Sequence, residues 1–208
     1  MEKKNQKKQY STNDVVIRKA LKNRLENEHL GDKRLRIVDE LGVQHGVARV
    51  DLVVVNGIMH GYEIKSDLDT LKRLPEQMNV FNSVFDKMTL VVGKNHLHDA
   101  IKIIPEWWEI IIAKVDENGS IAFNKIRDGE YNKNQDTVSI AKLLWREEAL
   151  KILENEGEAI GLYSKSRDII YNRLASVFNK DTLSDKVRET LFFRTDWRLD
   201  SPLVLNGD

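Results

Sequence analysis

Three charged residues stand in a part of the chain that otherwise reads as buried and apolar. Asp51, Glu63 and Lys65 all fall within residues 47–66, on two apolar segments joined by an Asn-Gly pair. A buried charge is costly unless it is paired with an opposite charge or bound to a metal ion. Two carboxylates and an ammonium on one predicted hairpin therefore indicate a metal site.

A metal site of this kind requires both carboxylates on one face of the hairpin. With a two-residue turn at positions 56 and 57, Asp51 and Glu63 would point to opposite faces of the sheet. We therefore expect a three-residue connection or a bulge, with Gly57 or a neighbour in a left-handed conformation. This geometry would return the two carboxylates to the same side.

The composition limits the kind of metal and the class of protein. The 208 residues are 41% hydrophobic and 32% charged, which is typical of a globular domain with a real core. The absence of cysteine excludes disulfides and thiolate-bound zinc, so oxygen ligands and Mg²⁺ or Mn²⁺ are expected. The sequence has neither a membrane-length apolar run nor the apolar core of a signal peptide, which favours a cytoplasmic protein without a membrane partner.

The pattern of apolar residues predicts the elements that would position the three charges. We expect a helix over 13–29, a short strand over 35–38 that ends near Glu40, and then the central hairpin. A helix should begin at Pro75, place Gln77 in its first turn and continue to about residue 87. Beyond it we expect a strand at 88–92, a helix at 96–105, a second hairpin at 109–126, and helices at 137–155, 164–178 and 183–197.

The predicted organisation has three parts: a basic flexible tail at 1–12, an α/β core at 13–132 and a helical extension at 133–208. In the extension, arginines stand beside aromatic residues, at Trp145-Arg146, Tyr171-Asn172-Arg173, Phe193-Arg194 and Trp197-Arg198. Such pairs could stack on bases and contact phosphates. The interpretation that we favour is that they are core aromatics with flanking surface cations.

One motif resembles that of a known superfamily. Asp51, eleven intervening residues and then Glu63-Ile64-Lys65 resemble the signature of the PD-(D/E)XK nucleases. The expected order of helix, strand, hairpin, helix and strand over 13–92 resembles their restriction-endonuclease-like αβββαβ core, a mixed central sheet flanked by helices. The resemblance implies this α/β fold with an added hairpin and a C-terminal helical segment.

Further matches resemble a branch of small bacterial and phage proteins in that superfamily, with RecB-like and Holliday-resolvase-like features. Gln77 with Phe81 is similar to the Gln-x-x-x-Tyr element of RecB-like members, although Phe replaces Tyr. The other matching positions are Glu40, Arg49, Tyr62, Ser66, Asp67, Asp69, Thr70, Arg73 and Leu74.

The resemblance implies a metal-dependent nuclease, and specifically a Mg²⁺-dependent deoxyribonuclease that leaves 5′-phosphate ends. Asp51, Glu63 and the backbone carbonyl of Ile64 would bind Mg²⁺ or Mn²⁺. Lys65 would orient or deprotonate the attacking water and neutralise developing charge.

The remaining assignments are secondary to this group. Glu40 is the candidate auxiliary acid, with Glu26 and Glu28 on the first helix as alternatives. Gln77 would bind the water, a metal ligand or the substrate backbone. The candidates for contact with nucleic acid are Arg49, Ser66 and Arg73.

Two other interpretations stay open. The chain could be a non-cleaving module that binds nucleic acid or a protein partner on the same fold, or the three charges could form a structural ion-pair cluster. DNA is the expected partner. Because the formal net charge is zero, nonspecific affinity should be modest and could be assisted by a homodimer or a protein partner.

Overall fold

A six-stranded mixed β-sheet forms the centre of the molecule in the computed structural model, which describes residues 11–195. Neighbouring strands follow the order of the sequence: β1 (Arg36–Val43), β2 (Ala48–Val55), β3 (Met59–Lys65), β4 (Lys87–Gly93), β5 (Glu109–Val115) and β6 (Ile121–Arg127). The pairs β1–β2, β2–β3 and β5–β6 are antiparallel, whereas β3, β4 and β5 are parallel neighbours.

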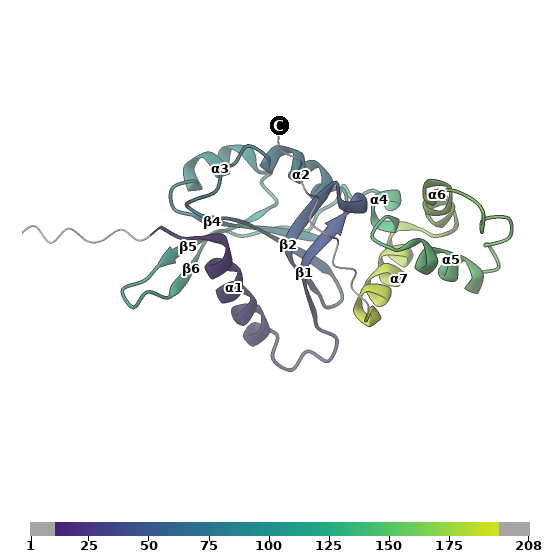
Figure 1. The fold of residues 1–208 in the computed structure, drawn as a ribbon, viewed down its shortest axis with the longest axis horizontal. Helices are drawn as coiled ribbons and strands as arrows, with labels where there is room; N and C mark the ends of the chain where they lie inside the picture. The colour runs from purple at the N-terminus through teal and green to yellow at the C-terminus, as the bar shows by residue number, and fades with distance from the viewer. Residues whose placement is uncertain (1–10, 196–208) are drawn as a thin grey trace, which may run out of the picture.

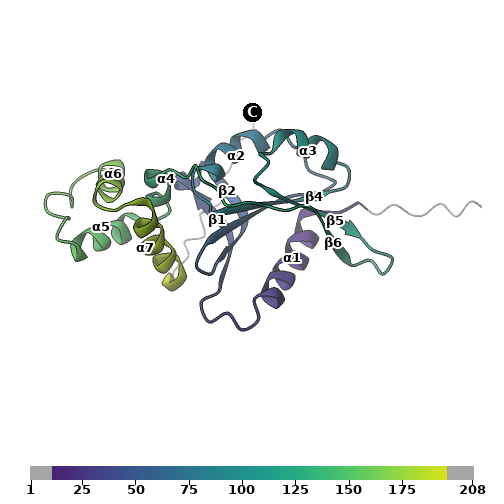
Figure 2. The same ribbon diagram turned by 180° about the vertical axis from the view of Figure 1, so that it is seen from behind.

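Helices cover both faces of this sheet. The helix α1 (Asp14–Glu28) lies on one face, and α2 (Leu74–Asn82) and α3 (Leu97–Ile103) lie on the other (Figure 1). Four further helices stand beside β1 and β2: α4 (Thr137–Ala141), α5 (Arg146–Asn155), α6 (Arg167–Val177) and α7 (Lys180–Phe193). The reverse view in Figure 2 shows the same arrangement, so the predicted α/β fold with a mixed sheet between helices is confirmed.

The alternation of side chains along β2 divides the core into two clusters. Leu52 and Val54 face α1 and pack with Ile17, whereas Val53 and Val55 face the side of α2 and α3. Val50, however, lies in the same cluster as Val53 and Val55, so the alternation is interrupted between Val50 and Leu52, at the position of Asp51.

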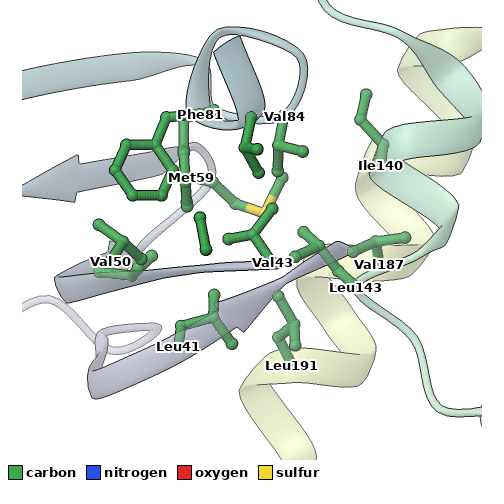
Figure 3. Close-up of a cluster of buried hydrophobic side chains, with 14 of the residues drawn as sticks. Leu41, Val43, Val50, Met59, Phe81, Val84, Ile140, Leu143, Val187 and Leu191 are labelled. Atoms are coloured by element: carbon green, nitrogen blue, oxygen red, sulfur yellow. The ribbon is translucent and has the colours of Figure 1, made fainter. Parts of the chain in front are cut away.

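The larger cluster continues from the sheet into the C-terminal helices. Figure 3 shows its junction, where side chains of β1 and β2 meet those of α4, of the residues just after it and of α7: Leu41, Val43, Val50, Ile140, Leu143, Val187 and Leu191. All of these side chains are at most 5% exposed. The segment predicted as a helical extension therefore shares one hydrophobic core with the sheet.

Several predicted boundaries are wrong, and two of the differences have a local cause in the structure. The helix expected over 137–155 is broken, because the carboxylate of Glu148 accepts the backbone N–H of Trp145 at 2.7 Å and starts a new helix. The helix that contains Pro75 ends at Asn82, where the side-chain amide of Asn132 donates a hydrogen bond to the Asn82 carbonyl oxygen at 2.7 Å. The first strand does not end at residue 38 but runs to Val43.

Two of the arginine–aromatic pairs have structural partners. The Tyr171 hydroxyl is buried and donates to the Leu144 carbonyl at 2.9 Å. The guanidinium of Arg194 lies 4.3 Å from the centroid of the Trp145 ring and donates to Glu148. The pair at 197–198 and most of the predicted tail at 1–12 lie outside the described residues.

No helix within residues 11–195 combines the length and the apolar character that crossing a membrane requires.

The shared core predicts that α7 stabilises the sheet. Replacement of Leu191, which is fully buried, by alanine should lower the free energy of unfolding by about 2–5 kcal/mol, because it leaves a cavity against β1 and β2. Urea denaturation monitored by circular dichroism measures this change. The matched control is Phe193→Ala on the same helix, where the side chain is 63% exposed and the effect should stay within about 0.5 kcal/mol. Equal losses in the two variants would contradict the shared core.

Candidate functional site

The connection between β2 and β3 has the length that the candidate site requires. Val55 pairs with Met59, so three residues form the turn, and Gly57 has a φ of 98°. The predicted three-residue connection with a left-handed glycine is therefore confirmed. In this register, Asp51 stands opposite Glu63, one position beyond the last pair of the ladder.

The strands β2 and β3 separate where these carboxylates lie. The last pair in the ladder is Leu52 with Tyr62. Beyond it, the backbone N–H of Ile64 donates to Oδ2 of Asp51 at 2.7 Å, so a carboxylate takes the place of a strand carbonyl. The Ile64 side chain packs on the opposite face, in the cluster beneath α1.

Glu63 and Lys65 form a buried ion pair on the α2 side of the sheet. Nζ of Lys65 donates to Oε1 of Glu63 at 2.5 Å and to Oε1 of Gln77 at 3.0 Å. Gln77 lies in the first half of α2, and the packing of this helix brings it into contact with Lys65, twelve positions earlier in the chain. The structure thus joins three of the predicted site residues in one chain of contacts.

The Glu63 carboxylate is short of partners. It is 1% exposed, and within residues 11–195 its second oxygen, Oε2, is buried without a hydrogen-bond partner. Burial raises the pKa of Glu63 to about 7, and the charge of Asp51 adds to this rise, whereas Lys65 and Gln77 oppose it. A bound cation would satisfy this oxygen and favour the ionised carboxylate.

Arg18 of α1 completes the charge balance on the other side of Asp51. Its guanidinium donates to Oδ1 of Asp51 at 2.7 Å and to Oδ2 of Asp14 at 3.1 Å, and it also pairs with Glu40. Burial raises the pKa of Asp51, while the Ile64 amide and the Arg18 charge oppose that rise. Arg18 is thus a cation held by three carboxylates.

Sequence reasoning missed both Arg18 and Asp14. The available signal was the face of the first helix: Ile17 and Leu21 are buried, so Arg18 borders the buried stripe and lies one turn from Asp14. The alternatives considered on this helix, Glu26 and Glu28, are exposed near its far end.

Glu40 lies inside β1 and not at its end. It stands opposite Asp51, between the pairs Asp39–Leu52 and Leu41–Val50, and its φ is 54°. A non-glycine residue with positive φ inside a strand is strained, and such strain is common at functional sites. The strained backbone leaves the Glu40 side chain exposed beside Arg18 and 3.8 Å from Arg49.

The three candidates for nucleic-acid contact lie in different environments. Arg49 is half-buried beside Glu40, and Arg73 is exposed at the start of α2. Ser66 is buried, and its hydroxyl donates to Oδ2 of Asp69 at 2.6 Å. The structure therefore brings Arg49 close to the carboxylates, whereas Ser66 stabilises the turn after β3.

The donor set is small for a metal site. No group of three histidine, cysteine, aspartate or glutamate residues that could hold a metal occurs within residues 11–195. The ligands available to a hard cation are the two carboxylates, Asp51 and Glu63, together with backbone oxygen and water. The buried, unpartnered Oε2 of Glu63 fits such a cation.

The sequence comparisons give the family. The profile of the family described as "Bacteriophage P4 protein cII" matches residues 7–198. The chain belongs to the bacteriophage P4 protein cII family. A curated member of similar sequence is Protein cII of Enterobacteria phage P4, which is 33% identical over 93 residues, or 45% of this chain and 35% of that protein. The alignment thus covers about a third of the length of the phage P4 relative.

Among solved structures, this cII-family chain resembles the SPO1766 protein of unknown function from Silicibacter pomeroyi. The two are 16% identical, with a TM-score of 0.41, and the match covers 72% of this chain and 94% of the other.

The raised pKa of Glu63 predicts a pH-dependent loss of stability. The pKa of Glu63 is about 7 in the folded protein, whereas the unfolded chain releases this proton near the ordinary glutamate pKa of 4.5. The free energy of unfolding should therefore fall between these pH values and level off above them, by about 1.4 kcal/mol for each unit of pKa difference. Glu63→Gln should remove this part of the slope.

Urea denaturation over that pH range, in EDTA, measures the slope for both proteins. Glu26→Gln removes an exposed carboxylate from α1 and should leave the slope as it is in the wild type. Identical slopes for the wild type and Glu63→Gln would show that the Glu63 carboxylate is not desolvated as described.

Proposed function

We propose that this chain is a metal-dependent nuclease that hydrolyses phosphodiester bonds in DNA and leaves 5′-phosphate ends, on a PD-(D/E)XK core. The observation that carries the proposal is the desolvated Glu63 carboxylate, with one oxygen on Lys65 and the other without a partner in the described part of the chain. A buried carboxylate left in this state is costly unless a ligand uses it.

The order of elements supports the proposal. The series α1, β1, β2, β3, α2, β4 agrees with the αβββαβ core that the sequence resemblance implies. Asp51 lies near the start of β2, and Glu63 and Lys65 lie at the end of β3, where the two strands separate. The functional groups thus stand at an open end of the hairpin rather than inside a closed ladder.

Asp51, Glu63 and the carbonyl of Ile64 would hold the cation, Mg²⁺ or Mn²⁺. Because the N–H and C=O of a strand residue point to the same edge, the Ile64 carbonyl is directed to the edge where its N–H meets Asp51. When bound, the metal would supply a more acidic water and charge neutralisation at the leaving oxygen.

Lys65 would act on the attacking water and on the charge that develops at phosphorus. Glu63 and Gln77 fix its Nζ from two sides, so the ammonium is positioned before substrate arrives. Gln77 is therefore a positioning residue in this proposal. Glu40 and Arg49 stand at the exposed side of the same group, next to Asp51 and Arg18.

The proposal predicts that Lys65→Ala removes cleavage without unfolding the protein. Loss of a group that transfers or orients a proton should slow Mg²⁺-dependent cleavage of DNA by about 10²–10⁴-fold. Gel assays on labelled single-stranded and duplex DNA measure the rate, and thermal unfolding checks the fold. Lys114→Ala, which removes an exposed ammonium from β5, is the control and should cleave as the wild type does. A folded wild-type protein that cuts neither DNA nor RNA in the presence of Mg²⁺ or Mn²⁺ would contradict the proposal.

A second candidate function is a non-cleaving module that binds nucleic acid or a protein partner. The observation that favours it is the position of Arg18, whose guanidinium already satisfies Asp51, Asp14 and Glu40. In this case Arg18 would be the permanent cation of the site. In the nuclease, by contrast, Arg18 competes with the metal for Asp51.

The two functions predict different effects of Arg18→Gln on Mn²⁺ binding. In the nuclease, removal of the competing guanidinium should tighten Mn²⁺ binding about 10-fold, which corresponds to about 1.4 kcal/mol. Isothermal titration calorimetry measures the affinity. Arg24→Gln on the same helix breaks an exposed pair with Glu28 and should leave it unchanged. Absence of Mn²⁺ binding in both the wild type and Arg18→Gln would favour the non-cleaving module.

A further inference from the structure

We propose that one strand of nucleic acid lies in a cationic cleft between β1 and the C-terminal helices, where Arg146 and Arg167 bind its phosphates. The identity of the ligand as nucleic acid rests on the proposed function. The cleft borders the proposed site through Glu40 and Arg49, and its other side is built by the C-terminal helical segment.

The cleft has a volume of about 300 Å³ and is formed by segments that are distant in the sequence. β1, the turn at 44–46 and Arg49 line one side, and the segment 142–147, Arg167 and Arg194 line the other. Five basic side chains face three acidic ones, Asp39, Glu40 and Glu147. Arg194 is paired with Glu148 and Lys142 with Asp168, both outside the lining, so the excess positive charge of the hollow comes from Arg146 and Arg167.

Two of these basic side chains keep an uncompensated charge. The Arg146 guanidinium donates to the backbone carbonyls of Tyr163 and Lys165, which carry no net charge. Within residues 11–195, no carboxylate lies within ion-pair distance of Arg146 or Arg167. Arg194, in contrast, is buried against Glu148. Arg146 and Arg167 can therefore donate charge-assisted hydrogen bonds to phosphate oxygens.

The turn that lines the cleft, at residues 44–46, is affected by these positive charges. Burial lowers the pKa of His45, the charges of Arg167 and Lys142 lower it further, and the charge of Asp168 opposes this. His45 and Gln44 both have positive φ, at 59° and 48°. Strained backbone of this kind is held by its surroundings and is common where ligands bind.

A second hollow continues from the cleft and favours a polymer over a single phosphate. It is lined by Asp14, Val15, Arg18, Lys19 and Lys22 of α1, and it shares Asp39 and Glu40 with the first. Arg18 is already paired with Asp14, Glu40 and Asp51, and Lys22 is paired with Asp39, so Lys19 is the cation that this hollow offers to a second phosphate. A strand that occupies both hollows passes Glu40, the carboxylate next to Asp51. A free phosphate or a single phosphorylated side chain would fill one hollow only.

Binding to a labelled oligonucleotide in EDTA tests the inference without cleavage. Arg146→Gln and Arg167→Gln should each weaken binding about 5-fold at about 0.15 M salt and lower the slope of log K against log salt by about 0.7–0.9. Fluorescence anisotropy with a single strand and with its duplex shows which form is preferred. The matched control is Arg173→Gln on α6, which removes the same charge from an exposed pair with Glu158 outside the cleft.

The outcomes separate this inference from the proposed nuclease. Unchanged affinity and salt slope in both cleft variants, or affinity for a phosphoserine peptide but none for either oligonucleotide, would overturn the cleft as a strand site, even if the protein cleaves DNA. Weakened binding in both cleft variants but not in Arg173→Gln would support it, even if the wild type fails to cut. Because Arg146 also holds two backbone carbonyls, Arg167→Gln serves as the variant free of that structural role.

Discussion

The burial of the Glu63–Lys65 pair is the constraint around which the site is arranged. A carboxylate that is 1% exposed must be compensated, and Lys65 satisfies only one of its oxygens. The Lys65 ammonium in turn donates to Gln77, and this contact requires the first half of α2 to lie against the end of β3. One desolvated charge thus fixes the relation between the hairpin and the helix that follows it.

Arg18 shows how the fold balances negative charge near this pair. Three carboxylates, from α1, β1 and β2, converge on one guanidinium, which is half-buried and preorganised as a planar donor. The two functions proposed above give this arginine opposite roles. In a nuclease it competes with the metal for Asp51, and in a binding module it replaces the metal.

Most strands of the sheet, and the nearness of Asp51 to Glu63, could be predicted from the sequence. The parity argument at Asn56-Gly57 gives the turn length correctly, since a two-residue turn would have separated Asp51 from Glu63. Arg18 could not be found in the same way, because its role depends on how α1 packs across β1 and β2. The break between α4 and α5 was also hidden, since it depends on a capping contact of Glu148 and on Arg194, which is distant in the sequence.

The shared core has a consequence for how the chain is made. The face of β1 and β2 that carries Leu41 and Val50 is covered by α4 and α7, and α7 ends only at Phe193. A ribosome releases the first strands long before it releases that last helix. During this interval the apolar sheet surface is exposed to solvent, so this part of the core can close only after α7 has been synthesised.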